Sequence, residues 1–143
     1  VSPKISGTKV VWREFYDGLP QIIVYDIETS ERLQLTYNGS NGEHDVAGGN
    51  VVWVNQSRGK TSIYLFDGTS IIRVSDSSNA TRPIVNERYV AYSQIFQPES
   101  RVWQGVIYDL QTKKSSIVVQ GTEQEAGYPD FEASLYKVYM TPN

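Results

Sequence analysis

The chain has 143 residues, a formal net charge of -3 at pH 7 and no cysteine. Acidic and basic residues are interspersed, which argues against a surface for nucleic acid or anionic lipid, since both require a basic face. The absence of cysteine excludes disulfides, thiol catalysis and thiolate metal sites, and no apolar stretch approaches the ~18 residues of a membrane-spanning helix.

A repeat of about forty residues organises the sequence. PKISGTKVVW, at residues 3–12, returns as HDVAGGNVVW at 44–53 and as PIVNERYVAY at 83–92, and a shortened copy, YPDFEASLYKVYM, follows at 128–140. A second matched segment follows each full copy as IIVYDIET, SIYLFDGT and VIYDLQT. A period of this length built from short segments predicts propeller blades, each of which must stack on a neighbour to bury its faces.

Each full copy predicts four short strands. Val, Ile, Tyr, Trp and Thr dominate the expected strands, and Gly, Asn, Asp and Ser fill the gaps between them. No window of ten or more residues combines helical spacing of apolar positions with a helix cap. The expected strands are 4–6, 9–14, 21–28 and 32–36 in the first copy, 45–47, 50–55, 62–66 and 71–75 in the second, 84–85, 89–94, 105–109 and 116–119 in the third, and 130–131 and 135–140 in the last.

The predicted fold is therefore all-β, a partial β-propeller of three four-stranded antiparallel blades plus a two-stranded half blade. The predicted blade boundaries are 1–43, 44–81 and 82–127, with the half blade at 128–143. Both alternating sets of IIVYDIE are largely apolar, which is typical of a sheet that lies between two other sheets.

Three elements of the repeat carry a resemblance to a known family. A short strand led by Pro3 or Pro83, a strand that ends in an aromatic residue and a Tyr-Asp strand followed by Thr resemble the TolB-type propeller repeat. The resemblance covers nearly the whole chain and implies a propeller of the kind found in bacterial and archaeal cell-surface and envelope proteins. It implies little about activity, because such propellers serve many roles. His44 departs from the pattern, since it occupies the proline position of the second copy.

Three aspartates recur with the repeat. Asp26, Asp67 and Asp109 are 41 and 42 residues apart, and each is followed within three residues by Thr. An aspartate at a strand end can accept hydrogen bonds from the main chain of the following turn. We therefore predict turn residues and not a catalytic carboxylate series.

Three aromatic residues also recur, at Trp12, Trp53 and Tyr92. Their position within a strand of every copy predicts packing between blades. Trp103 lies outside the repeat, in a third connection at residues 95–104 that is longer than its counterparts at 15–20 and 56–61. A unique loop on a repetitive scaffold favours a binding role, although an insertion that only covers a blade edge fits equally well.

No catalytic or metal-binding set emerges from the remaining residues. His44 is the only histidine, and Glu43 and Asp45 beside it are expected to point to the opposite face. A metal site would need further ligands that the sequence does not supply, and no nucleophile elbow or phosphate-binding loop is present. Residues 38–43 lack the spacing of a calcium loop and predict a flexible turn. We predict no catalytic residue, no metal and no cofactor.

The preferred function is a non-catalytic binding or scaffolding segment that contacts a protein partner. The loops that join the second strand to the third, and the fourth to the next blade, are expected to meet on one face. Two alternatives remain open, a carbohydrate-binding propeller with Tyr16 and Trp103 as stacking platforms and the accessory propeller of a larger enzyme. The candidate binding residues on this face are Tyr16, Asp17, Asn55, Arg58, Phe96, Arg101 and Trp103.

The setting is expected to be the cell surface, the periplasm or the extracellular space. Sequons at Asn38, Asn55 and Asn79 are a slight indication of this. The chain opens on Val1 with no visible signal peptide and is expected to be a segment of a longer protein. Three and a half blades cannot close a ring, so both ends of the stack are expected to expose apolar faces. These faces would contact further blades or a second copy of the chain.

Overall fold

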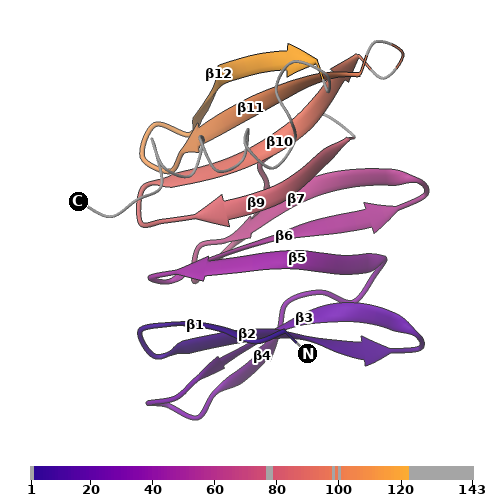
Figure 1. Ribbon diagram of the computed structural model, residues 1–143. Coiled ribbons are helices and arrows are strands. Elements are labelled where there is room, and N and C mark those ends of the chain that lie inside the picture. The colour runs from indigo at the N-terminus through magenta and orange to yellow at the C-terminus, as the bar shows by residue number, and fades with distance from the viewer. Residues whose placement is uncertain (1, 77–78, 98, 100, 123–143) are drawn as a thin grey trace.

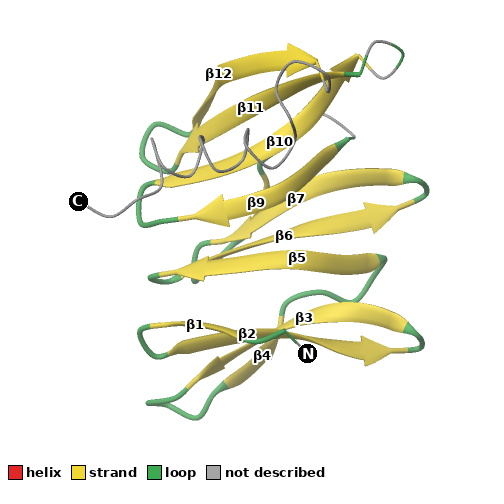
Figure 2. Cartoon of the chain, viewed as in Figure 1, coloured by secondary structure: helices red, strands yellow, loops and turns green. Residues whose placement is uncertain are grey.

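A computed structural model gives the fold and describes residues 2–76, 79–97, 99 and 101–122 (Figure 1). Within these residues the chain forms twelve strands and no helix, as Figure 2 shows. The strands are β1 (Lys4–Ser6), β2 (Lys9–Tyr16), β3 (Leu19–Asp26), β4 (Arg32–Gln34), β5 (Ser40–Ala47), β6 (Asn50–Ser57), β7 (Lys60–Phe66), β8 (Ile71–Arg73), β9 (Ala80–Val85), β10 (Tyr89–Gln97), β11 (Val102–Asp109) and β12 (Lys114–Thr122).

The strands form three antiparallel sheets of four, each in chain order: β1 to β4, β5 to β8 and β9 to β12. We call these sheets blade 1, blade 2 and blade 3. The prediction of an all-β chain with three four-stranded blades is confirmed. The expected half blade at 128–143 lies outside the described residues. The part of the chain that the structure describes contains no helix long and apolar enough to cross a membrane.

The blades stack face to face, and apolar side chains fill both junctions (Figure 1). Val11 and Ile22 of blade 1 share a buried cluster with Trp53 of blade 2. Ile63 of blade 2 shares another with Tyr92 of blade 3. Both faces of blade 2 are therefore buried, as the apolar composition of the strands predicts for an inner sheet. Burial of this apolar surface is the main force that holds the stack together.

Trp12 differs from the aromatic residues at the same position in the other blades. Trp53 and Tyr92 are each 2% exposed and lie in the two junctions. Trp12 is only half-buried, because it lies on the face of blade 1 that points away from blade 2. Its indole N–H donates to Glu14 at 2.9 Å. The prediction of packing between blades is confirmed for Trp53 and Tyr92, whereas no described blade lies against Trp12.

Two-residue turns close the hairpins between the second and third strands of blades 1 and 2. Asp17 and Gly18 have φ values of 52° and 78°, and Arg58 and Gly59 have values of 53° and 73°. Positive φ at both central residues matches the type I′ turn, whose twist fits that of the flanking strands. The strands therefore continue to the tips, and the expected loops at 15–20 and 56–61 are mostly strand.

The third hairpin also has less loop than the sequence suggests. Ile95 pairs with Trp103 and Gln97 with Val102, so β10 and β11 extend into the segment that was expected to be a loop at 95–104. The prediction of a long loop there is wrong. Gln, Glu and Ser residues interrupt the apolar alternation of this segment, so the sequence does not indicate a strand there. In the folded chain, cross-strand pairing extends both strands through it.

The first strands of blades 2 and 3 carry a bulge that the sequence did not reveal, and the corresponding residue of blade 1 also has positive φ. Ser2, Glu43 and Arg82 have positive φ values of 61°, 42° and 56°, and each directly precedes the proline position of the repeat. In blades 2 and 3 the pairing of the first strand with the second shifts register there, so that two residues of the first strand lie opposite one residue of the second. In blade 2 that one residue is Trp53. The bulge lets β5 and β9 begin earlier than predicted, and Asn41, expected in a flexible turn, is buried in β5.

The fourth strands of blades 1 and 2 end two residues earlier than predicted. Past their ends, side-chain hydroxyls replace main-chain acceptors. The Ile22 N–H donates to Thr36 Oγ1 at 2.9 Å, and the Ile63 N–H donates to Ser75 Oγ at 2.9 Å. These buried bonds satisfy the main chain of the third strand while the chain leaves the sheet toward the next blade.

The repeated aspartates act in turns, as predicted. Oδ1 of Asp26, Asp67 and Asp109 accepts bonds of 2.7–3.4 Å from the main-chain N–H groups two and three residues farther along. Such bonds from Ser70 and Thr69 hold the pKa of Asp67 below its usual value, because they favour the ionised carboxylate. Each carboxylate serves the turn of its own blade.

Candidate functional site

The predicted site residues of blade 1 lie at the tip of the β2–β3 hairpin. Asp17 is an exposed turn residue, and Tyr16 is 40% exposed at the end of β2. The Tyr16 hydroxyl donates to Glu14 at 2.6 Å and accepts from Arg32 at 3.0 Å. Hydrogen bonds from Tyr16 and Trp12, together with Arg32, hold the pKa of Glu14 below its usual value. Tyr16 is thus part of a polar cluster on the surface of blade 1.

The predicted residues of blade 2 have two different environments. Asn55 lies near the end of β6, and its side-chain amide is hydrogen-bonded to the connection between blades 1 and 2. Arg58 is exposed at the tip of the β6–β7 hairpin. Of the seven predicted residues, Asn55 is the one whose side chain lines the groove described below.

The predicted residues of blade 3 surround its β10–β11 hairpin. Arg101 is exposed in the connection, and Trp103 is half-buried in β11 opposite Ile95. Phe96 lies in β10, and its side chain is outside what the structure describes. Tyr16 and Trp103 belong to blades 1 and 3, with blade 2 between them (Figure 1). They therefore do not form a single stacking platform.

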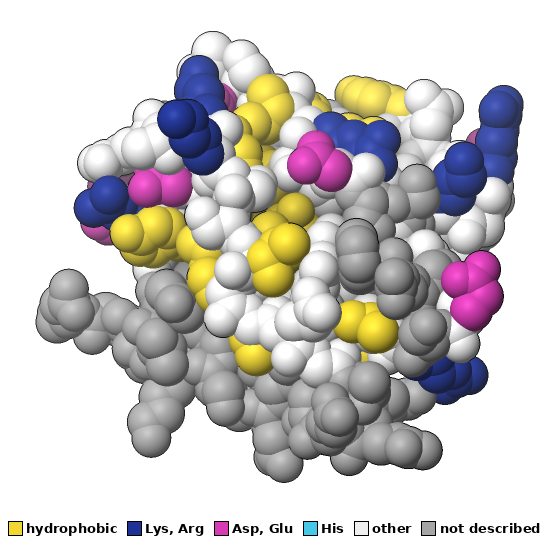
Figure 3. All heavy atoms as spheres, turned by 90° about the horizontal axis from the view of Figure 1, so that it is seen from above, with side chains coloured by type: hydrophobic (Ala, Val, Ile, Leu, Met, Phe, Trp, Pro, Cys, Tyr) yellow, Lys and Arg dark blue, Asp and Glu magenta, His cyan; other side chains and the backbone are white. Residues whose placement is uncertain are grey.

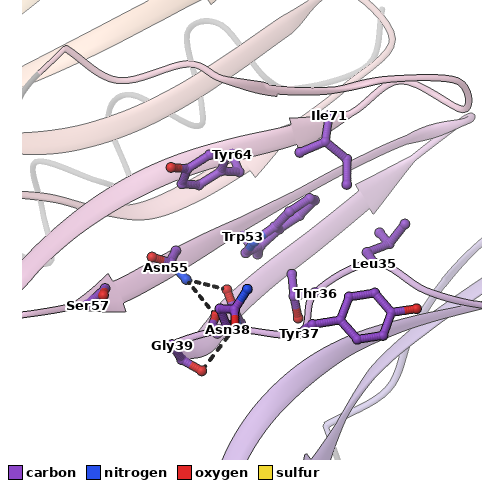
Figure 4. A pocket seen from close by; sticks show the side chains of 11 residues that line it. Leu35, Thr36, Tyr37, Asn38, Gly39, Trp53, Asn55, Ser57, Tyr64 and Ile71 are labelled. Carbon is purple, nitrogen blue, oxygen red and sulfur yellow. Dashed lines mark hydrogen bonds between the residues drawn. The ribbon is translucent and has the colours of Figure 1, made fainter.

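A groove of about 270 Å³ lies at the junction of blades 1 and 2 (Figure 4). Three aromatic side chains line it: Tyr37 from the β4–β5 connection, Trp53 from β6 and Tyr64 from β7. Trp53 and Tyr64 are stacked, with ring centroids 6.2 Å apart and an angle of 17° between their planes. Tyr37 is 70% exposed. The other lining residues are Leu35, Thr36, Asn38, Gly39, Asn41, Asn55, Ser57 and Ile71.

A network of asparagine side chains forms the polar wall of this groove. Asn41 is fully buried, and its Nδ2 donates to Gln21 Oε1 and to the Asn38 carbonyl oxygen, each at 2.9 Å. Asn55 Nδ2 donates to Asn41 Oδ1 at 2.8 Å and to the Asn38 carbonyl oxygen at 3.2 Å. The network connects β3, β5 and β6 to the β4–β5 connection and fixes the shape of the wall.

His44 lies in the bulge of β5 and is 4% exposed. Neither ring nitrogen has hydrogen-bond geometry with a described residue. Burial and the nearby charges of Lys4 and Arg13 lower the pKa of His44, and the main chain of Ser2 and the Asp45 carboxylate offset this only in part. The histidine is therefore neutral in the folded chain near pH 7.

Positive and negative side chains are mixed on the end of the stack at which blade 3 lies (Figure 3). Figure 3 views the stack from the end at which blade 3 lies, and Lys and Arg side chains are interspersed there with Asp and Glu. Among the residues that the structure describes, no group of three or more His, Asp or Glu residues is placed to hold a metal ion.

Comparisons with solved structures place this arrangement among known folds. The chain superposes on a protein assigned as TolB from Agrobacterium tumefaciens with a TM-score of 0.59 and 19% identity, over 80% of this chain and 46% of that one. The chain has the fold of a β-propeller segment. A chain of a nidogen–laminin complex matches this propeller segment with a TM-score of 0.53 and 13% identity, over 79% and 44% of the two chains. The tricorn protease matches with a TM-score of 0.54 and 11% identity, over 80% of this chain and 12% of that one.

The propeller segment spans less than half the length of each of these chains. No protein-family model matches its sequence, and no curated protein matches it either. At these low identities the likeness concerns the fold.

The groove contains residues that sequence reasoning did not group together. Trp53 and Tyr64 are cross-strand partners in the β6–β7 hairpin of blade 2, and the connection from blade 1 brings Tyr37 to them. A partial signal was present, because Tyr37 and Asn38 precede Gly39 in a segment without strand pattern. Aromatic and amide residues beside a turn are common at binding loops.

Gly39 makes a testable contribution to the groove. Its φ is +71°, and a Cβ there would lie 2.9 Å from Asn55 Nδ2 and 3.0 Å from the Gln56 carbonyl oxygen. Gly59 has nearly the same φ, +73°, and has no neighbour within 4 Å of such a Cβ. In urea unfolding we expect Gly59→Ala to lower the free energy of unfolding by about 1–2 kcal/mol, the cost of left-handed backbone. Gly39→Ala should lower the free energy of unfolding clearly more. Equal losses in the two variants would show that the asparagine side chains of the wall move aside without cost.

Proposed function

We propose that this chain is a non-catalytic binding and scaffolding segment of a TolB-like β-propeller that acts by protein–protein contact. The contacted surface is an apolar β-sheet face of the blade type, supplied by a further blade of the same protein or by a second copy of the chain. This proposal assigns the chain no catalytic residue, metal or cofactor of its own.

One observation carries the proposal, the uncovered face of blade 1. Ile5, Val46 and Val85 occupy the same position in the three blades, each paired with the second residue of the next strand. Val46 and Val85 are 8% and 7% exposed, because the preceding blade covers them, whereas Ile5 is 65% exposed. A face that the repeat buries in blades 2 and 3 is thus left open in blade 1 by the residues that the structure describes, and open apolar faces mark interaction sites.

The hairpin end of blade 1 supports contact with a protein partner as well. Phe15 is 63% exposed and Leu19 44%. Exposed aromatic side chains supply much of the binding energy at protein interfaces. Arg58 and Arg101 lie at the corresponding hairpin ends of blades 2 and 3 and could extend the surface across the stack (Figure 1).

The setting that fits this function is the cell envelope or the extracellular space. The fold likeness to a protein assigned as TolB and the sequons of the sequence support this location. Immunodetection of the full-length protein in periplasmic and surface fractions would test it, and a cytoplasmic protein would contradict it.

The open face can be tested by measuring association. Sedimentation velocity of the chain at micromolar concentration is expected to show concentration-dependent dimers or larger species. Ile5→Asp places a charge on the open face and should shift the chain toward monomer, because an unpaired charge opposes burial. Leu33→Asp is the matched control, since Leu33 is 47% exposed and pairs with Val24, whose side chain points toward blade 2 and away from the open face.

The melting temperatures of both variants should stay close to that of the parent chain, since each side chain is exposed. A monomeric parent chain, or equal association of Ile5→Asp and the parent, would contradict the proposal.

A further inference from the structure

We propose that the groove between blades 1 and 2 binds an uncharged carbohydrate. This site is separate from the open face of blade 1, and the inference does not depend on the association proposed above. Its volume of about 270 Å³ is just below the ~300–1,000 Å³ of sites for drug-sized ligands, so it suits one or two ring-sized groups.

Tyr37 supplies an exposed aromatic surface at the edge of the groove. Tyr37 is 70% exposed, and its ring extends from the β4–β5 connection, as Figure 4 shows. An aromatic face that stays open to solvent can pack against the apolar C–H face of a sugar ring, while the ring hydroxyls remain free for polar contacts. The stacked pair of Trp53 and Tyr64 forms the opposite, rigid part of the lining.

Asn55 supplies a fixed acceptor for a ligand hydroxyl. Both hydrogen bonds of its Nδ2 go to Asn41 Oδ1 and the Asn38 carbonyl oxygen, so the orientation of the amide is determined (Figure 4). Its Oδ1 accepts no hydrogen bond from another described residue. A preorganised acceptor with one open direction favours a donor such as a sugar hydroxyl, because no reorganisation is needed on binding.

The charge of the lining determines the class of ligand. None of the described residues that line the groove is charged. An acidic or basic ligand would lose hydration there without gaining an ion pair, whereas a neutral polyol can exchange its water contacts for amide and hydroxyl groups. Asn38 and Ser57 add uncharged hydrogen-bonding groups to the lining. Neutral sugars therefore fit better than uronic acids, sialic acids or sulfated sugars.

A glycan array that carries both neutral and acidic oligosaccharides, probed with the labelled 143-residue chain, tests the inference. We expect binding to neutral oligosaccharides of hexoses or N-acetylhexosamines and no preference for acidic ones. Titration of the best-bound neutral oligosaccharide should change tryptophan fluorescence, because Trp53 lines the groove. Tyr37→Ala should weaken this binding at least tenfold, or ~1.4 kcal/mol. Tyr37→Phe, which keeps the ring, should largely retain it.

Ile117→Ala is the matched control, since Ile117 is a 57% exposed apolar residue of blade 3 that does not line the groove. This variant should bind like the parent chain. Circular dichroism should show the same β-spectrum for all three variants, because the two residues that they alter, Tyr37 and Ile117, are exposed. The inference is overturned if no neutral oligosaccharide binds, if acidic glycans bind better, or if Tyr37→Ala binds as tightly as the parent chain.

Discussion

Replacement of Trp53 by alanine is expected to lower the free energy of unfolding by about 3–5 kcal/mol, the usual cost of truncating a core aromatic residue. Trp53 is 2% exposed, shares a buried cluster with Val11 and Ile22 of the neighbouring blade, and stacks on Tyr64. Its loss would leave a cavity in the junction of blades 1 and 2. Urea unfolding followed by circular dichroism measures the change.

Trp12→Ala is the matched comparison, because Trp12 occupies the same position of the repeat in blade 1. It is half-buried and has no preceding blade against it among the described residues. We expect a loss of about 1–2 kcal/mol, within the common range for point substitutions. If the two variants lose the same free energy, Trp12 is as well packed as Trp53 and the face of blade 1 is covered.

Acidification is expected to weaken the junction of blades 1 and 2 through His44. The folded chain holds the pKa of His44 below its ordinary value of 6.5, chiefly by burial, so the unfolded chain binds the proton more readily. The free energy of unfolding therefore rises with pH in this range. The contribution of neutral His44 to the free energy of unfolding is fully present above about pH 6.5. It is lost progressively as the pH falls through this value toward the lower folded pKa. Melting temperatures measured between pH 8 and pH 5 should show the decline.

His44→Pro tests the origin of this decline. Proline occupies the same position in the other copies as Pro3 and Pro83, and the β5–β6 ladder skips His44, so the substitution should be tolerated. The variant should have a flatter stability profile between pH 8 and pH 5. Asp26, Asp67 and Asp109 have lowered pKa values and lose their contributions only near pH 4 and below, outside this window. An unchanged profile in His44→Pro would assign the decline to other groups.

The repeat was enough to predict the architecture, because side-chain alternation and turn residues recur at the same positions of each copy. Both faces of IIVYDIE are apolar, and this correctly indicated a sheet between sheets. The strand ends were less predictable. Thr36 and Ser75 look like further strand residues in the sequence, yet their hydroxyls end the sheet by replacing main-chain acceptors. Glu43, in the bulge of β5, likewise has positive φ, although glutamate is not a residue type that indicates positive φ in a sequence.

The candidate site was predicted less well, for a topological reason. The sequence pointed to Tyr16 and Trp103 as unusual aromatic residues, but strand pairing places them on blades 1 and 3. Asn55 was among the predicted residues and does line the groove. Tyr64, 9 residues after it, lies on the neighbouring strand of the same blade, whereas Tyr37, 18 residues before it, reaches the groove only through the contact between two blades. Such a contact leaves no spacing pattern in a single copy of the repeat.

The residue before the proline position of the repeat, which lies in the bulges of blades 2 and 3, shows that backbone and side chain meet different requirements there. At this position the repeat requires a left-handed main chain, and it meets this requirement with Ser2, Glu43 and Arg82, which are neutral, anionic and cationic respectively. The main-chain conformation at this position thus recurs from blade to blade, whereas the charge of the side chain differs. Charge-altering substitutions at Ser2 and Glu43 could change the electrostatic potential along the first strands of blades 1 and 2 without altering how the blades stack.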